Sequence, residues 1–204
     1  MSARTEVPPG VAALDALAGQ LLLRAGVRVG VAHTIVELGA VHRLRHREIS
    51  SETFTALGSE PDVLGPDPYD DHALHLAAWR GTALVATMRL VLPVPGRALP
   101  TEDAFGLRIE PRGEVVDVGR LLAGPAHRGD PAHRAWGGLF GLAWQEARAR
   151  SYTVMAGIAS EQLVERYRSL GVNVELLGEP RTDSGAELYP LRLDQAAGEP
   201  PDWF

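Results

Sequence analysis

The stretch Val115-Val116-Asp117-Val118-Gly119-Arg120-Leu121-Leu122 decides the fold of this chain. Its valines and leucines predict a strand, with an acid and a base inside it. Strict alternation places Asp117 and Arg120 on opposite faces, but a glycine inside a strand often marks a bulge, which re-aims the residue after it. A bulge at Gly119 would therefore bring both side chains to one site.

Apolar spacing on both sides of this stretch predicts the remaining elements. Leu14, Leu17, Leu21 and Leu22 form the stripe of a first helix that ends at Gly26. We expect a strand at 27–34, a helix through 36–47, a hairpin of strands 72–79 and 83–92, an irregular excursion at 93–112, and then a helix through 136–147, a strand at 153–159, a helix at 161–170 and strands at 172–177 and 188–193.

Length and composition fit one domain with short additions. The chain has 204 residues, 45% of them hydrophobic and 23% charged, which is typical of a globular protein. We expect an N-terminal arm and helix at 1–26, one domain at 27–196 and a tail at 197–204. The first helix either packs on the core or forms the contact of a homodimer.

Several function classes are excluded by the residues that are missing. The chain has no cysteine, and all 20 basic residues are arginine, so thiolate chemistry, Schiff bases and a P-loop lysine are ruled out. A net charge of −6 argues against nucleic-acid binding. No signal peptide and no apolar run of about 18 residues is present, so we expect a cytoplasmic protein without a membrane span.

The histidine spacing predicts no metal site. His42 and His46 are four residues apart on a helix but lack the glutamate of a His-Glu-x-x-His zinc motif. His72 and His75 have opposite strand parity. The Gly-x-Ser-x-Gly elbow of serine hydrolases is also absent.

Four segments, in order along residues 40–194, resemble one group of acyltransferases. They are Val41-His42-Arg43-Leu44-Arg45-His46-Arg47, Tyr69-Asp70-Asp71-His72-Ala73-Leu74-His75-Leu76, Thr87-Met88-Arg89-Leu90-Val91 and Asp117-Val118-Gly119-Arg120. Together they are similar to the GNAT superfamily, in the branch of acyl-homoserine lactone synthases, long-chain N-acyl amino acid synthases and ornithine lipid acyltransferases. The last segment is similar to that branch's Glu-x-Ser-Arg or Glu-x-Gly-Arg signature, with Asp117 in place of Glu.

The resemblance implies a mixed α/β fold, with a mostly antiparallel, twisted central sheet flanked by helices and an extra N-terminal helix. Two central strands splay apart in that fold, and the pantetheine arm of a thioester donor lies between them. It implies donor contacts at Leu121, Leu122, Arg128, Gly129, Gly137 and Gly138. Acyl-CoA or an acyl carrier protein thioester would be a co-substrate, with no permanently bound cofactor.

The same resemblance implies a catalytic set. Asp117 is the candidate base for an amine, with Arg120 beside it, and a bulged strand offers a backbone amide to the oxyanion. Tyr167 is the candidate acid for the leaving thiolate, and core packing is the alternative for it. We expect the acceptor to contact Arg89, Arg45, Asp70 and Asp71. The alternative for Asp117, Arg120 and Arg89 is a buried ion-pair network that fixes strand register.

The sequence therefore predicts an N-acyltransferase that moves an acyl group, favoured as a fatty acyl group, from a carrier protein or CoA to an amino acid or similar small amine. A short-chain acetyl-CoA enzyme is the first alternative, but residues 130–138 do not reproduce the Arg-x-x-Gly-x-Gly loop of such enzymes. A non-catalytic ligand-binding domain is the second. An acidic carrier protein would need a basic patch, either Arg43, Arg45 and Arg47 or Arg128, Arg134, Arg148 and Arg150.

Overall fold

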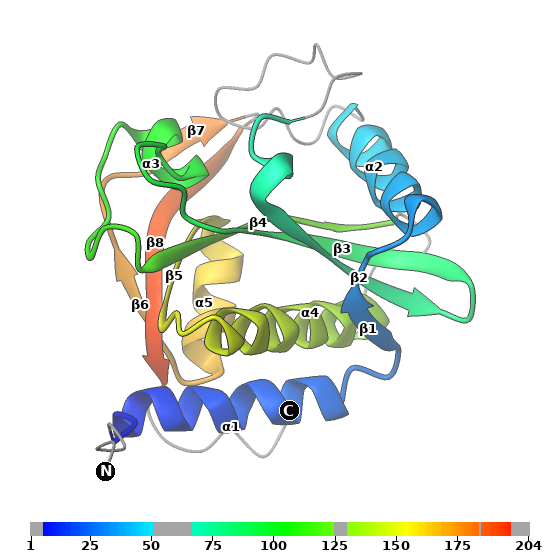
Figure 1. Ribbon diagram of the computed structural model, residues 1–204, viewed down its shortest axis with the longest axis horizontal. Coiled ribbons are helices and arrows are strands. Elements are labelled where there is room, and N and C mark those ends of the chain that lie inside the picture. The colour runs from blue at the N-terminus through cyan, green and yellow to red at the C-terminus, as the bar shows by residue number, and fades with distance from the viewer. Residues whose placement is uncertain (1–5, 51–66, 125–129, 184, 197–204) are drawn as a thin grey trace.

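One eight-stranded sheet runs through the protein in the computed structural model, which describes residues 6–50, 67–124, 130–183 and 185–196 (Figure 1). The strand order is β1-β2-β3-β4-β5-β8-β6, with β7 paired to β8. Only β4 and β5 pair in parallel among these strands, so the predicted mixed, mostly antiparallel sheet is confirmed. The strands are β1 Arg28–Val31, β2 Ala73–Arg80, β3 Ala83–Val91, β4 Val115–Ala123, β5 Val154–Ser160, β6 Val172–Leu176, β7 Arg181–Asp183 and β8 Ala186–Ala196.

Helices cover both faces of the sheet (Figure 1). They are α1 Pro9–Leu23, α2 Ile35–Ser50, α3 Pro100–Phe105, α4 Asp130–Ala149 and α5 Glu161–Ser169, and a 3₁₀ turn spans Asp70–His72. Helices α1, α4 and α5 lie on one side, and α2 and α3 lie on the other. Helix α1 packs on α4 and β8, so the predicted N-terminal helix belongs to the core; the homodimer stays a prediction. No helix within the described ranges combines the length and the apolar character that crossing a membrane requires.

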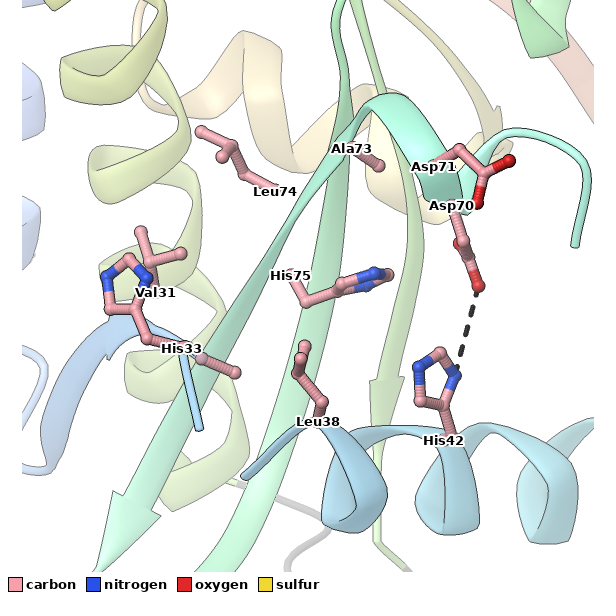
Figure 2. Close-up of a pocket in the computed structure, with 10 residues that line it drawn as sticks. Val31, His33, Leu38, His42, Asp70, Asp71, Ala73, Leu74 and His75 are labelled. Atoms are coloured by element: carbon pink, nitrogen blue, oxygen red, sulfur yellow. Dashed lines mark ion pairs between the residues drawn. The ribbon is translucent and has the colours of Figure 1, made fainter. Parts of the chain in front are cut away.

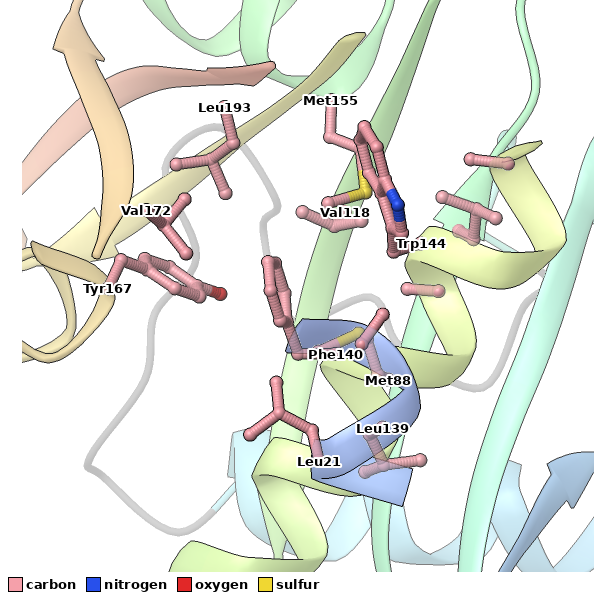
Figure 3. Packing of buried hydrophobic residues seen from close by; sticks show 14 of the residues in the cluster. Leu21, Met88, Val118, Leu139, Phe140, Trp144, Met155, Tyr167, Val172 and Leu193 are labelled. Carbon is pink, nitrogen blue, oxygen red and sulfur yellow. The ribbon is translucent and has the colours of Figure 1, made fainter. Parts of the chain in front are cut away.

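The main core lies between the sheet and helices α1, α4 and α5 (Figure 3). The predicted stripe of α1 is buried at Leu14, Leu17 and Leu21, and α4 contributes Leu139 and Trp144. Burial of such side chains stabilises the fold by roughly 1.5–3 kcal/mol each. The large side chains on this face therefore hold the sheet against these three helices, and two smaller apolar clusters lie beside α3 and α2.

Two elements were missed in the sequence. The excursion at 93–112 contains α3, a six-residue helix with too few turns to show a period. Strand β7 has three residues and only one partly buried position, so it has no apolar alternation. Helix α5 begins after Ser160, whose side chain makes no cap hydrogen bond, and Gly171 follows the end of the helix at φ +78°.

The predicted bulge in β4 is confirmed. Thr87 of β3 pairs with Leu122, and Arg89 pairs with Gly119. Strand β4 therefore advances three residues over the distance in which β3 advances two. Arg120 occupies the extra position with φ +53°, a left-handed conformation that costs a residue with a Cβ about 1 kcal/mol or more. The bulge turns the Arg120 side chain to the face that α2 and α3 cover.

Strands β4 and β5 stay together for only four residues. Pairing runs from Val115 opposite Val154 to Val118 opposite Gly157, and β5 then continues to Ser160 along β8. Gly157 permits the last contact, because a Cβ there would meet the Val118 carbonyl oxygen at 2.7 Å. Within the described residues, the two strands therefore part where the bulge begins.

Candidate active site

A buried network of ion pairs lies on the α2 and α3 side of the sheet. Arg45 Nη1 lies 3.0 Å from both carboxylate oxygens of Asp70. Arg89 Nη1 reaches Asp70 at 3.0 Å and Asp67 at 2.6 Å, and Arg120 Nη2 donates to Asp67 at 2.9 Å. Helix α2, strands β3 and β4 and the segment before β2 are thereby joined at one point.

The fold itself brings these groups together. His75, Arg89 and Gly119 are cross-strand partners on β2, β3 and β4, and Asp117 lies two residues before Gly119 on the same face. Helix α2 adds Arg45 from above this row. Side chains far apart in the sequence thus share one surface because antiparallel strands set their register.

The two aspartates of the network are held ionised. Burial by itself raises the pKa of Asp67, but Arg89, the Tyr69 N–H and Arg120 outweigh it and lower that pKa to about 2. Burial likewise opposes ionisation of Asp70, and Arg45 and Arg89 overcome it, so the Asp70 pKa is also lowered. Both carboxylates therefore bind arginine at neutral pH and do not act as bases.

His75 is a neutral member of the same cluster. Its Nδ1 accepts a hydrogen bond of 2.8 Å from Arg45, and only 7% of the residue is exposed. Burial, together with the charge of Arg45, lowers the His75 pKa to about 4. Arg45 is therefore held from two sides, by the Asp70 carboxylate and by the His75 ring.

Asp117 differs from the aspartates of the network. It is 2% exposed, and its Oδ2 accepts the backbone N–H of Thr101 at 2.9 Å. Burial raises its pKa to about 6, although Thr101 and the charge of Arg89 act in the opposite direction. A carboxyl group with a pKa near neutral is suited to take up and release a proton.

Helix α3 is fastened beside Asp117. The Glu102 carboxylate accepts the N–H groups of Leu99 and Ile109, each at 2.8 Å, and so closes the segment around the helix. The Tyr69 hydroxyl bonds to Asp103, and the Tyr69 ring lies 5.5 Å from the Arg89 guanidinium carbon. The excursion at 93–112 thus forms a wall of the site.

A pocket of about 440 Å³ opens on the far side of the ion network (Figure 2). His42, Asp70 and His75 point toward one another there, with ligand atoms within 4.8 Å of one another. This grouping differs from the histidine pairs weighed in the sequence. Arg45 already donates to both Asp70 and His75, and a metal ion would have to displace that cation. The donor set therefore suits an arginine better than a metal.

The structure places the remaining predicted site residues as follows. Asp71 is exposed on the rim of the pocket. Tyr167 is buried in the main core with its ring 5.0 Å from that of Phe140, and burial raises its pKa (Figure 3). Leu121 packs against the main core and Leu122 is buried on β4, while Gly137 lies in α4. Arg128 and Gly129 lie outside the described residues.

Gly138 has a packing partner of its own. A Cβ at this position would lie 2.6 Å from the Ala25 Cβ and 3.0 Å from Val29 Cγ2. The glycine thus lets α4 approach the turn between α1 and β1, and donor contact at Gly138 stays a prediction.

Several arginines of the two basic patches predicted for a carrier protein form ion pairs within the protein. Arg45 is buried in the ion network, so this residue is not part of an exposed patch on α2. Arg148 binds Asp15 of α1, and Arg150 binds Glu146. Arg43 and Arg47 of α2 and Arg134 of α4 are exposed.

Sequence reasoning missed Asp67, Tyr69, His75 and Thr101 as parts of the site. Asp67 and Tyr69 lie close to the predicted Asp70 in the sequence. Asp67 is an acid just before the segment that resembles the acyltransferases, and this position was the sequence signal that could have identified it. Thr101 interacts through its backbone N–H, which no side-chain pattern reveals.

Comparison with known proteins gives a family match for the middle of the chain. Residues 44–136 match the family model of an acetyltransferase (GNAT) domain, and this range holds the network arginines and Asp117. The chain has the GNAT fold. The GNAT resemblance seen in the sequence is thereby confirmed, and no curated protein matches the chain.

The solved structures similar to this chain include acyl-homoserine lactone synthases. MesI, described as CoA-dependent, is 22% identical with a TM-score of 0.65, over 82% of this chain and 88% of MesI. BjaI, solved with SAM and isopentyl-CoA, is 20% identical with a TM-score of 0.66, over 83% and 84% of the two chains. ElaA of Escherichia coli is 17% identical with a TM-score of 0.55, over 81% and 98%. At these identities the likeness concerns the fold.

Proposed function

We propose that this protein is an N-acyltransferase that moves an acyl group from a thioester of CoA or acyl carrier protein to the amino group of an amino acid or similar small amine. The observation that carries the proposal is Asp117, a buried carboxyl with a pKa of about 6, beside the point where β4 and β5 part. The match to an acetyltransferase (GNAT) domain and the synthase neighbours support it.

The reaction joins the amine nitrogen to the thioester carbonyl carbon and breaks the carbon–sulfur bond. Asp117 takes the proton that the amine loses, which is worth about 10²–10⁴-fold in rate. The bulge at Gly119 and Arg120 turns backbone amides away from the regular ladder, so that one is positioned to donate to the developing oxyanion. The leaving thiolate takes up a proton, and Tyr167 is the donor predicted for it, although its ring packs against Phe140 in the main core.

The ion network has a supporting part in this scheme. Arg89 is the cross-strand partner of Gly119, and its charge favours the ionised form of Asp117. Arg45, Asp70 and Asp67 hold Arg89 in place. A long acyl chain is favoured over acetyl because residues 130–138 depart from the loop of acetyl-CoA enzymes.

Thiol release from acetyl-CoA, palmitoyl-CoA and a palmitoyl carrier protein, each with a panel of amino acids and amines, tests the proposal. The protein has no cysteine and adds no thiol background. Amine-dependent release from a palmitoyl donor is expected. Release from acetyl-CoA alone would favour the short-chain alternative, and binding of a donor without release would favour the non-catalytic one.

A further inference from the structure

The buried residues of helix α3 are both polar. They are Thr101 and Glu102, whereas Ala104 and Phe105 of the same helix are only partly buried. The helix has six residues, and isolated helices shorter than about 12–15 residues are marginal in water. Contacts from other elements must therefore fix the place of α3.

Arg181 of β7 makes such a contact at the C-terminal end of α3, which lies beside this strand (Figure 1). Its Nη1 donates to the Ala104 carbonyl oxygen, and its Nη2 donates to the Phe105 carbonyl oxygen at 3.3 Å. The Arg181 guanidinium carbon also lies 5.1 Å from the centre of the Phe105 ring. The last carbonyls of a helix have no partner within it, and a basic side chain can satisfy them. One arginine thus holds the end of the helix.

The opposite end of α3 carries the contact to the candidate base. The Thr101 backbone N–H lies 2.9 Å from Oδ2 of Asp117. A helix of six residues has less than two turns, so a shift at its C-terminal end moves its N-terminal end as well. Arg181 on β7 is thereby linked to the place of a carboxylate on β4.

The ionisation of Asp117 depends on this contact. Burial raises the pKa of Asp117 to about 6, and Thr101 acts in the opposite direction. The charged and titratable groups that act on Asp117 come from α3, β3 and the segment before β2, and they are Glu102, Arg89 and Tyr69. The cross-strand neighbours of Asp117 on β3 and β5 are uncharged. Weakening the Thr101 contact should therefore raise the pKa of Asp117 further.

We propose that Arg181 is a positioning residue for Asp117, which acts from β7 through helix α3 and the Thr101 N–H. This rests on the proposed acyl transfer. Arg181 contacts α3, and α3 contacts the acid. With both ends of the helix held, Asp117 is presented in one orientation to the group from which it takes a proton.

One substitution and one control test this assignment. Arg181→Met removes the guanidinium and keeps an unbranched side chain. Arg168→Met removes the same charge from α5, where the arginine binds Glu165 of its own helix. Both arginines are exposed, so neither change opens a cavity in the core.

Two properties are measured for wild type and both variants. The first is kcat with palmitoyl-CoA and the amine that gives the fastest thiol release from wild type, together with donor affinity. The second is the titration of Asp117, followed by NMR of protein labelled with ¹³C in its aspartate carboxyl groups. The Asp117→Asn protein identifies the Asp117 signal.

For Arg181→Met we expect kcat to fall at least about fivefold at unchanged donor affinity, because a small misplacement of a catalytic group lowers rates strongly. The midpoint of the Asp117 titration should rise by about half a pH unit, since the donor to the ionised form is weakened. This rise should persist in 1 M NaCl, where surface charges are screened beyond about 3 Å. Arg168→Met should keep kcat within about twofold of wild type and an unchanged titration.

An Asp117 titration or a kcat that is the same in Arg181→Met and in wild type would overturn the assignment. So would a rise that disappears in 1 M NaCl, because it would show a direct effect of the charge. Failure of the proposed function is seen separately, as wild-type protein that releases no thiol with any amine. The NMR titration needs no turnover, so in that case it still decides whether Arg181 acts on Asp117.

Discussion

The backbone N–H of Thr101 lies 2.9 Å from Oδ2 of Asp117 and joins helix α3 to strand β4. This bond offsets only part of the cost of burying the carboxylate, because the pKa of Asp117 is still raised to about 6. The candidate base is therefore held in place by a neutral donor, and the arginines around it are held by Asp67 and Asp70.

Asp117→Asn should be at least as stable as wild type at neutral pH. The folded pKa lies above the unfolded value near 3.8, so the charged carboxylate destabilises the fold above pH 6, and the penalty disappears as pH falls from about 6 to 4. Urea denaturation at pH 7.5 should show a gain of up to about 3 kcal/mol, and a smaller gain at pH 5. A variant less stable than wild type at both pH values would contradict the buried charge.

The pH dependence of acyl transfer should report two groups. Asp117 must be ionised and the amine must be neutral, and the amine has a pKa well above 6. A plot of log kcat/KM for the amine against pH should therefore have a slope of about two below pH 6 and of about one above pH 6. Initial rates from pH 5 to 9 check this, and a slope of one throughout would mean that Asp117 does not titrate in the reaction.

Arg45→Met should destabilise the protein by about 3–5 kcal/mol, because it leaves the buried Asp70 with one arginine fewer and His75 without its donor. Arg43→Met is the matched control, two residues earlier on the exposed side of α2, and should change stability by less than about 0.5 kcal/mol. Urea denaturation of both variants gives the comparison. A similarly small loss of stability in both variants would show that the ion network contributes little to the stability of the protein.

Gly138→Ala should destabilise by about 1–3 kcal/mol, since its Cβ would overlap Ala25. Gly19→Ala, in α1 with open space around it, should instead stabilise by about 0.5–1 kcal/mol. Thermal denaturation distinguishes them. A Gly138→Ala protein of normal stability that binds acyl-CoA weakly would favour the donor role over packing.

The sequence predicted much of the sheet and part of the site, and particular residues show why. Gly119 inside an apolar strand indicated the bulge, and the structure places its extra residue at Arg120. Arg45 could be assigned to α2 but not to the interior, because its partner Asp70 is 25 residues away. Asp67 binds Arg120 across 53 residues, which only the three-dimensional register of the strands determines.

The most direct test of the central claim is N-acyl product formation by wild type and by Asp117→Asn. Mass spectrometry would follow the amide formed from palmitoyl-CoA and an amino acid panel at pH 7.5, with donor affinity measured for both proteins. The account predicts an amide from wild type and at least about a 10²-fold slower reaction in Asp117→Asn at equal donor affinity. An amide formed equally fast by both proteins, or by neither, would contradict it.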